Sequence, residues 1–66
     1  MAKELFDVVM KVHGKSKLAL FVSDTGLHGD AVWLPLSQIE TQTIPGKPDY
    51  LEVTMPVWLA SKEGLI

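Results

Sequence analysis

Two tryptophan-centred segments in the second half of the chain constrain its fold more than any other feature. One covers residues 32–40 and the other residues 53–66, and together they hold both tryptophans and two of the four prolines. Proline fixes the backbone angle φ and lacks an N–H donor. Each proline in these segments therefore marks a point where a strand or a helix begins or ends.

The neighbours of the two prolines suggest how each segment is built. Because Pro35 cannot donate to a strand ladder, we expect it at a sheet edge, a bulge or a strand end. Ser37 and Gln38 follow it, and their side chains are expected to bond the backbone at the exit from the strand. Pro56 is expected to open a short helix that Gly64 caps, with the next residue folding back onto that helix.

Short apolar or alternating segments bounded by turn residues predict four strands before that helix. In residues 5–13 the spacing of the valines favours a strand, and an amphipathic helix capped by Gly14 stays open as the alternative. We interpret residues 13–16 as a turn and the polar residues 41–49 as a mobile connector. The expected elements are strands at about residues 5–13, 17–23, 31–36 and 50–55, and a helix at about residues 56–63.

The predicted fold class is mainly β, with one short helix and the element order ββββα. The expected architecture is a small, bent antiparallel four-stranded sheet or a partial barrel of the OB or SH3 kind, with the helix at one end. A chain of 66 residues holds one domain at most, so residues 1–66 are expected to form a single small β domain.

Composition limits the function. The chain is 47% hydrophobic and contains no cysteine, so disulfides and thiolate metal sites are excluded. In a domain this small, such apolar content indicates either a dense β core or an apolar face that another copy or another protein covers. The net charge of −2, with six lysines and no arginine, argues against strong binding to a phosphate backbone.

The residues that could carry chemistry have simpler interpretations. Asp24, His28 and Asp30 share a loop and could hold a metal ion, but aspartate before glycine or a strand is ordinary in turns. His13 is interpreted as a solvent-facing turn residue. Ser37 lacks the surroundings of a nucleophile. We expect no catalytic residue, no bound metal, no cofactor and no small-molecule substrate.

The tryptophans leave one question open. Trp33 alternates with its two apolar neighbours and so lies on the other side of its strand, while Trp58 lies in the expected helix. Each ring could belong to the core, where the two could pack on each other, or could anchor a partner. We take Trp33, Phe21, Tyr50 and Trp58 as candidate interaction residues.

Three blocks of sequence together resemble a known family. They are Leu20-Phe21-Val22-Ser23-Asp24, then Val32-Trp33-Leu34-Pro35-Leu36-Ser37-Gln38-Ile39, then Val53-Thr54-Met55-Pro56-Val57-Trp58-Leu59-Ala60-Ser61-Lys62-Glu63-Gly64-Leu65. They look like those of a family of short bacteriophage and prophage proteins without an assigned activity, over about residues 17–66. Leu36 departs from that pattern, where the family commonly carries lysine or another polar residue. The resemblance implies a phage gene, often among genes of DNA metabolism.

Two functions follow as hypotheses. The first is a non-enzymatic phage accessory protein that binds another protein or another copy of itself, the partner being a protein of DNA metabolism or host defence. The alternative is a small-barrel protein that binds single-stranded nucleic acid, stacking bases on its aromatic residues and contacting phosphates through Lys15, Lys17 and Lys47. The longest apolar run, residues 18–22, is too short to span a membrane. The start of the chain does not resemble a signal peptide, so we expect a cytoplasmic location, in the host cell if the gene belongs to a phage.

Overall fold

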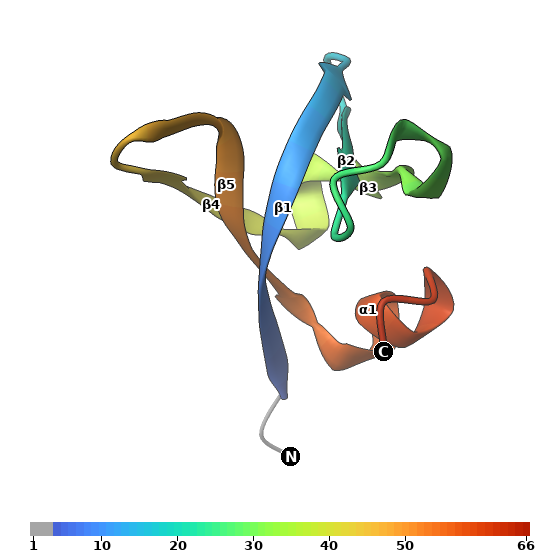
Figure 1. Ribbon diagram of the computed structural model, residues 1–66. Coiled ribbons are helices and arrows are strands. Elements are labelled where there is room, and N and C mark those ends of the chain that lie inside the picture. Colours follow the sequence, from blue (N-terminus) through green and yellow to red (C-terminus); the bar gives the residue numbers. More distant parts are fainter. Residues whose placement is uncertain (1–3) are drawn as a thin grey trace.

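The computed structural model describes residues 4–66 as one five-stranded sheet followed by a short helix (Figure 1). The elements are β1 (Leu5–Lys15), β2 (Ala19–Ser23), the 3₁₀ turn η1 (His28–Asp30), β3 (Val32–Pro35), the 3₁₀ turn η2 (Leu36–Gln38), β4 (Glu40–Ile44), β5 (Lys47–Pro56) and α1 (Val57–Lys62). The expected absence of a signal peptide rests partly on residues 1–3, which lie outside the described residues.

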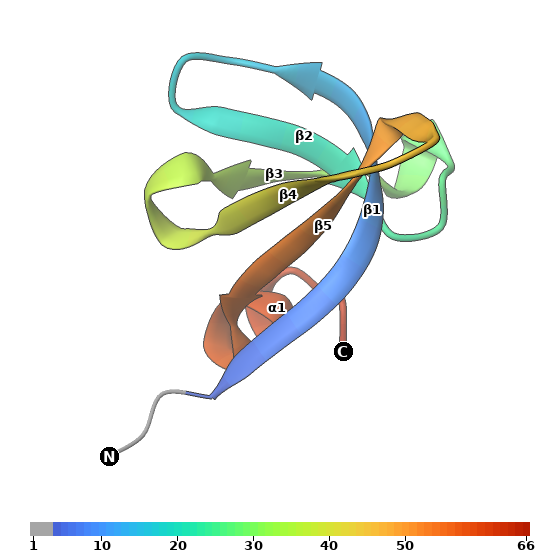
Figure 2. The ribbon, with the colours of Figure 1, turned by 90° about the vertical axis from the view of Figure 1, so that its left-hand side faces the viewer.

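All neighbouring strands are antiparallel, and their order across the sheet is β3-β2-β1-β5-β4. The sheet is strongly bent (Figures 1 and 2), yet it is open, because β3 and β4 are its two edges and do not pair. The predicted mainly β fold with a C-terminal helix is confirmed. The predicted number of four strands is wrong, and the sheet does not close into a barrel.

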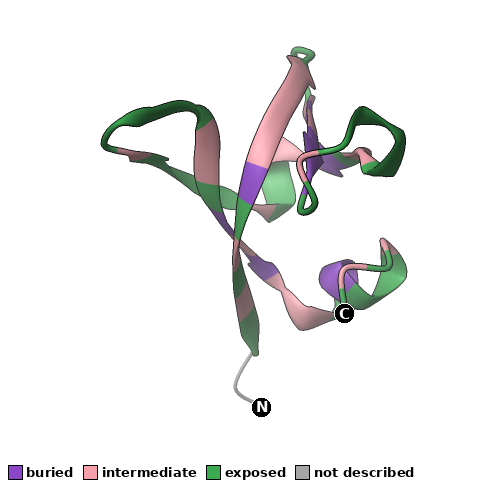
Figure 3. Cartoon of the chain, in the orientation of Figure 1, coloured by how far each residue is buried: buried purple, intermediate pink, exposed green. Residues whose placement is uncertain are grey.

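One face of the sheet, which we call the inner face, carries the core. Its buried side chains come from four strands and pack with two residues of α1. The members are Met10, Leu20, Val22, Leu34, Val53, Met55, Leu59 and Ala60 (Figure 3). The opposite side, the outer face, carries the alternate residues of each strand. Burial is thus concentrated on one side of a single sheet, as the alternating pattern requires.

The second tryptophan segment forms the end of β5 and then α1. The helix begins at Val57, one residue later than predicted, because Pro56 is the extended residue before it, with φ −63° and ψ 144°. Gly64 adopts a φ of 75°, while the N–H of Leu65 donates to the oxygen of Ala60 and the N–H of Gly64 to that of Ser61. This pattern is a Schellman cap. The prediction that Gly64 caps the helix is confirmed.

A bulge in β1 overturns two expectations for its C-terminal half. Val12 pairs with Val22 and Gly14 pairs with Phe21, so the register shifts by one residue between them. The strand continues to Lys15, which rules out both a helix capped by Gly14 and a turn at residues 13–16. The actual turn is held by Ser16, whose hydroxyl accepts the N–H of Ala19.

The polar segment 41–49, predicted to be a mobile connector, is a β-hairpin. Thr41 pairs with Val53 and Thr43 with Leu51, and the chain reverses between Ile44 and Lys47. Pro45 and Gly46 form the turn, and Gly46 has a φ of 79°. A proline followed by a residue with positive φ is the requirement of a type II turn. The turn chemistry was therefore present in the sequence, although the strand before it is too polar to show a buried face.

The hydrogen-bonding phase of the ladders shows which backbone groups are free at the edges. The N–H of Val57 donates to the oxygen of Glu4. Bonded pairs recur every second residue in an antiparallel ladder. The odd-numbered residues of β5, like Val57, therefore bond toward β1. Its even-numbered residues bond toward β4, where Gln42 faces Glu52. It follows that the N–H and C=O groups of Thr41 and Thr43 point away from the sheet.

Amide hydrogen exchange, measured by NMR, tests which amides of β4 are bonded to β5 and which point outward. We expect the amide of Gln42 to exchange more slowly than those of Thr41 and Thr43, because only the first is bonded within the sheet. Equal rates at the three positions, or slower exchange at Thr41 and Thr43, would contradict the proposed ladder.

Candidate aromatic interaction site

Four aromatic rings form a continuous cluster on the outer face, drawn from β1, β2, β3 and η1. We call it the aromatic cluster, and its members are His13, Phe21, His28 and Trp33. Phe21 is its centre, because it contacts the three other rings. Such ring contacts contribute about 0.5–1.5 kcal/mol each beyond the area that they bury.

Trp33 lies at the edge of this cluster on edge strand β3. Its ring stacks on that of Phe21, with 4.7 Å between centroids and 26° between planes, as expected for residues directly opposite each other on neighbouring strands. The residue remains 50% exposed. One ring face is therefore held in place by Phe21 while much of the indole stays open to a partner.

The loop between β2 and β3 lies across the outer face. His28, in η1, contacts Phe21 edge-on, with 5.4 Å between ring centroids. Gly26, at the start of the loop, approaches Tyr50 of β5, whose hydroxyl would lie 3.5 Å from a Cβ at that position. Gly26 also has a φ of 83°, so its conformation favours glycine.

His13 differs from its prediction as a solvent-facing turn residue. Its imidazole is half-buried and its Nε2 lies 2.7 Å from the Oγ of Ser23. The sequence alone could not predict this pair, because its members are ten residues apart and meet only through the bulge in β1. A hydroxyl beside an imidazole can form a nucleophile. However, Ser23 is 0% exposed, so a substrate has no access and the pair acts as a structural hydrogen bond.

This pair leads to a stability prediction. His13→Ala leaves the buried hydroxyl of Ser23 without its partner, and we expect it to lower the free energy of unfolding by about 1–3 kcal/mol. Ser23→Ala removes the hydroxyl together with its need for a partner and should cost less. The double variant should therefore be more stable than the sum of the single effects implies. Urea unfolding of all four proteins measures the coupling, and strictly additive effects would refute it.

The other candidate residues are spread more widely. Tyr50 lies on the outer face opposite Lys11, and the Nζ of Lys47 is 5.7 Å from the centroid of its ring. Lys15 ends β1 and Lys17 lies in the following turn. The lysines proposed for phosphate contact thus occupy two separate turns, one after β1 and one before β5.

Trp58 belongs to another surface. It lies on α1 and is 56% exposed, while Leu59 beside it is buried. Trp33 instead stacks on Phe21. The tryptophans therefore do not pack on each other across the core, and the interpretation of either ring as core is wrong.

The acidic loop shows turn chemistry. The carboxylate of Asp30 accepts a hydrogen bond of 2.8 Å from the hydroxyl of Thr25, which also accepts the N–H of Leu27. His28 is in contact with the aromatic cluster rather than with these groups. Among residues 4–66, no three or more side chains of His, Cys, Asp or Glu are grouped as metal ligands would be.

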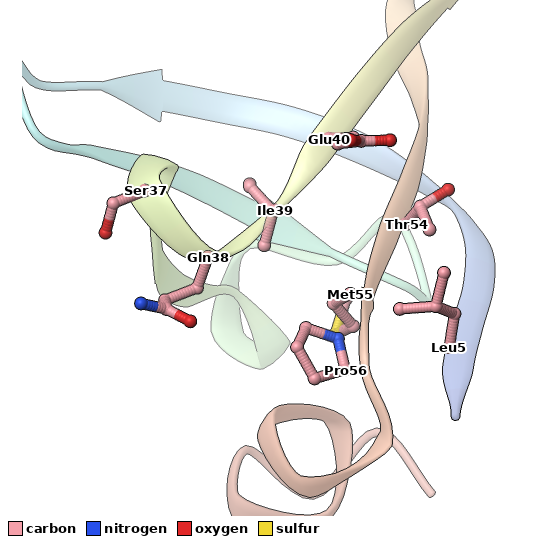
Figure 4. A pocket seen from close by; sticks show the side chains of 8 residues that line it. All are labelled: Leu5, Ser37, Gln38, Ile39, Glu40, Thr54, Met55 and Pro56. Atoms are coloured by element: carbon pink, nitrogen blue, oxygen red, sulfur yellow. The ribbon is translucent and has the colours of Figure 1, made fainter. Parts of the chain in front are cut away.

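Ser37 and Gln38 lie in η2 beside a pocket of about 350 Å³ (Figure 4). Among residues 4–66, neither side chain makes a hydrogen bond that would cap the strand, and η2 has no side-chain cap. The predicted capping by both residues is therefore not seen, and Pro35 alone ends the strand, at a sheet edge as expected. Neither histidine lines the pocket, so Ser37 has no imidazole base beside it.

Comparisons with known proteins give no match from which a function could be assigned. A scan against protein-family models, a search of curated proteins and a search of solved structures each give no match. Within residues 4–66, no helix has the length and apolar character needed to cross a membrane.

Proposed function

We propose that this chain is a non-enzymatic domain that acts by binding another protein through the aromatic cluster, with Trp33 as the anchor. The phage setting suggested by the tryptophan blocks, and a place in the host cytoplasm, belong to this proposal. The observation that carries it is the half-exposed Trp33 on an edge strand, stacked on Phe21. Aromatic residues held in one orientation lose little entropy on binding and are common among the residues that dominate interfaces.

The surroundings of Trp33 support a protein partner. Leu27, in the loop that lies across the outer face, is an exposed large apolar residue. A protein surface can cover such aliphatic groups, and their burial is favourable at about 25 cal/mol per Å². Nucleic acid has less apolar surface with which to cover them. A second copy of the chain is one possible partner.

The experiment compares Trp33→Ala with a matched control, Trp58→Ala, which removes the other exposed tryptophan. Each protein is immobilised and exposed to lysate of phage-infected cells, and its mass in solution is measured by light scattering after size exclusion. We expect a partner or a second copy to be retained by the wild type and by Trp58→Ala, and lost with Trp33→Ala. A wild type that stays monomeric and retains nothing, or equal retention by all three proteins, would refute the proposal.

Binding of single-stranded nucleic acid is the second candidate. One observation favours it: Phe21, Trp33 and Tyr50 all lie on the outer face. Against it stand the net charge of −2 and the carboxylates of Asp24 and Asp30 in the loop that crosses that face. Tryptophan fluorescence with oligonucleotides at low salt separates the two candidates, since a nucleic-acid binder must show quenching that weakens as salt is added.

A further inference from the structure

We propose that the free edge of β4 accepts an extended, lysine-bearing segment of a partner protein as a sixth strand of the sheet. The added strand presents cationic side chains to the outer face and apolar side chains to the inner face. This surface lies at the opposite edge of the sheet from Trp33 and does not depend on the function proposed above.

The backbone of β4 supplies the first argument. Thr41 and Thr43 direct their N–H and C=O groups away from β5, as the ladder phase requires. Both residues are exposed, and no strand within residues 4–66 pairs with β4 on its other side. A strand edge with free donors and acceptors at alternate residues is a template for strand addition.

The other edge of the sheet is a poorer template. The N–H of Leu36 donates to the oxygen of Leu18, so the alternate residues Trp33 and Pro35 direct their backbone outward. Pro35 has no N–H, and the N–H of Ala31 already donates to the oxygen of His28. Of these three residues, Trp33 alone has an outward N–H left, and strand addition therefore favours β4.

Two pockets beside β4 supply the second argument. The first, of about 350 Å³, includes Glu40 and Thr54 of the outer face (Figure 4). The second, of about 320 Å³, is lined by Thr41 and by apolar residues of the inner face such as Leu20 and Leu51, with Lys15 and Asp49 also in its wall. Successive side chains of a strand point to opposite faces. A strand paired with β4 would thus direct neighbouring side chains into the two pockets.

Charge identifies the class of occupant. Asp7, Glu40 and Glu52 occupy the outer face around β4 and β5, where their cross-strand neighbours include Thr54, Val9 and Gln42, none of them a cation. The carboxylate of Asp7 accepts the hydroxyl of Thr54. The outer side of the β4 edge is therefore acidic, whereas the inner side is mainly apolar, with Lys15 and Asp49 of opposite charge in its pocket. A segment that alternates lysine with aliphatic residues matches both.

The test uses a capped peptide of about six residues that alternates valine and lysine, with a glutamate-for-lysine peptide as the charge control. Backbone amide NMR should show saturable shifts at Glu40, Thr41 and Thr43, and slower exchange at Thr41 on binding. Thr41→Pro removes the outward N–H at an edge where proline is tolerated and should weaken binding by about tenfold. Thr41→Ala keeps that N–H and should bind within about threefold of wild type.

A second variant keeps the test valid if Thr41→Pro does not fold. Glu40→Lys combined with Glu52→Lys alters only exposed side chains, and it should reverse the preference so that the glutamate peptide binds better. Trp33→Ala should bind the valine–lysine peptide as wild type does, which separates this surface from the aromatic cluster. Absence of saturable shifts in β4, equal binding of both peptides, or loss of binding in Trp33→Ala would each overturn the proposal.

Discussion

Leu34→Ala is expected to remove about 3 kcal/mol from the free energy of unfolding. Leu34 is fully buried and lies on the inner face of β3, within the core cluster. Its truncation removes buried contacts and leaves a cavity among the core side chains of the inner face. A domain of this size has a total stability of about 3–10 kcal/mol. The variant should therefore lose about a third or more of that stability, and its midpoint in urea denaturation followed by circular dichroism should fall accordingly.

Trp33→Ala is the matched control for that experiment. Trp33 precedes Leu34 on the same strand and is the larger residue, but it is half-exposed and loses mainly its stack on Phe21. We expect a loss of about 1 kcal/mol. If Leu34→Ala proves too unstable to measure, Leu34→Val gives a smaller, graded loss. Should Trp33→Ala destabilise the protein more than Leu34→Ala, the inner face would not be the core.

The parts of the fold that could be predicted are those where burial leaves a pattern in the sequence. Phe6, Val8, Met10 and Val12 put an apolar residue at every second position, so β1 was expected to be a strand, and Pro56 with Gly64 marked the helix. In contrast, β4 is an edge strand whose first four residues are all exposed. It buries no alternate side chain and therefore leaves no periodic signal. Its turn residues, Pro45 and Gly46, were the usable clue.

The candidate site was likewise predictable only in part. Alternation along each strand places Phe21 and Trp33 on the face opposite the core, and the structure pairs them directly. The contact of His13 with Ser23 could not be foreseen, because a one-residue bulge sets the register of β1 on β2. The position of His28 depends on how the loop folds over the sheet. Local patterns thus predict which face a residue occupies, while irregular backbone determines which residues meet there.

Leu59→Ala should have an effect of similar size on the free energy of unfolding, a loss of about 2–4 kcal/mol. Leu59 is 2% exposed and joins α1 to the core of the sheet. A helix of six residues is too short to be stable alone, so α1 depends on packing against β5 and β1. Without Leu59 we expect α1 to detach and expose Met55 and Ala60. Urea unfolding, together with loss of exchange protection at the amide of Leu65, measures both consequences.

Trp58→Ala is the control, and it repeats the comparison made on β3. Trp58 precedes Leu59, is exposed, and lies in a helix where alanine has a higher intrinsic propensity than tryptophan. That gain offsets part of the lost apolar contact, so the net change should stay within about 1 kcal/mol. In both Trp-Leu pairs, the leucine is buried and holds the fold, whereas the tryptophan is exposed. A larger loss from Trp58→Ala than from Leu59→Ala would show that α1 packs through its other face.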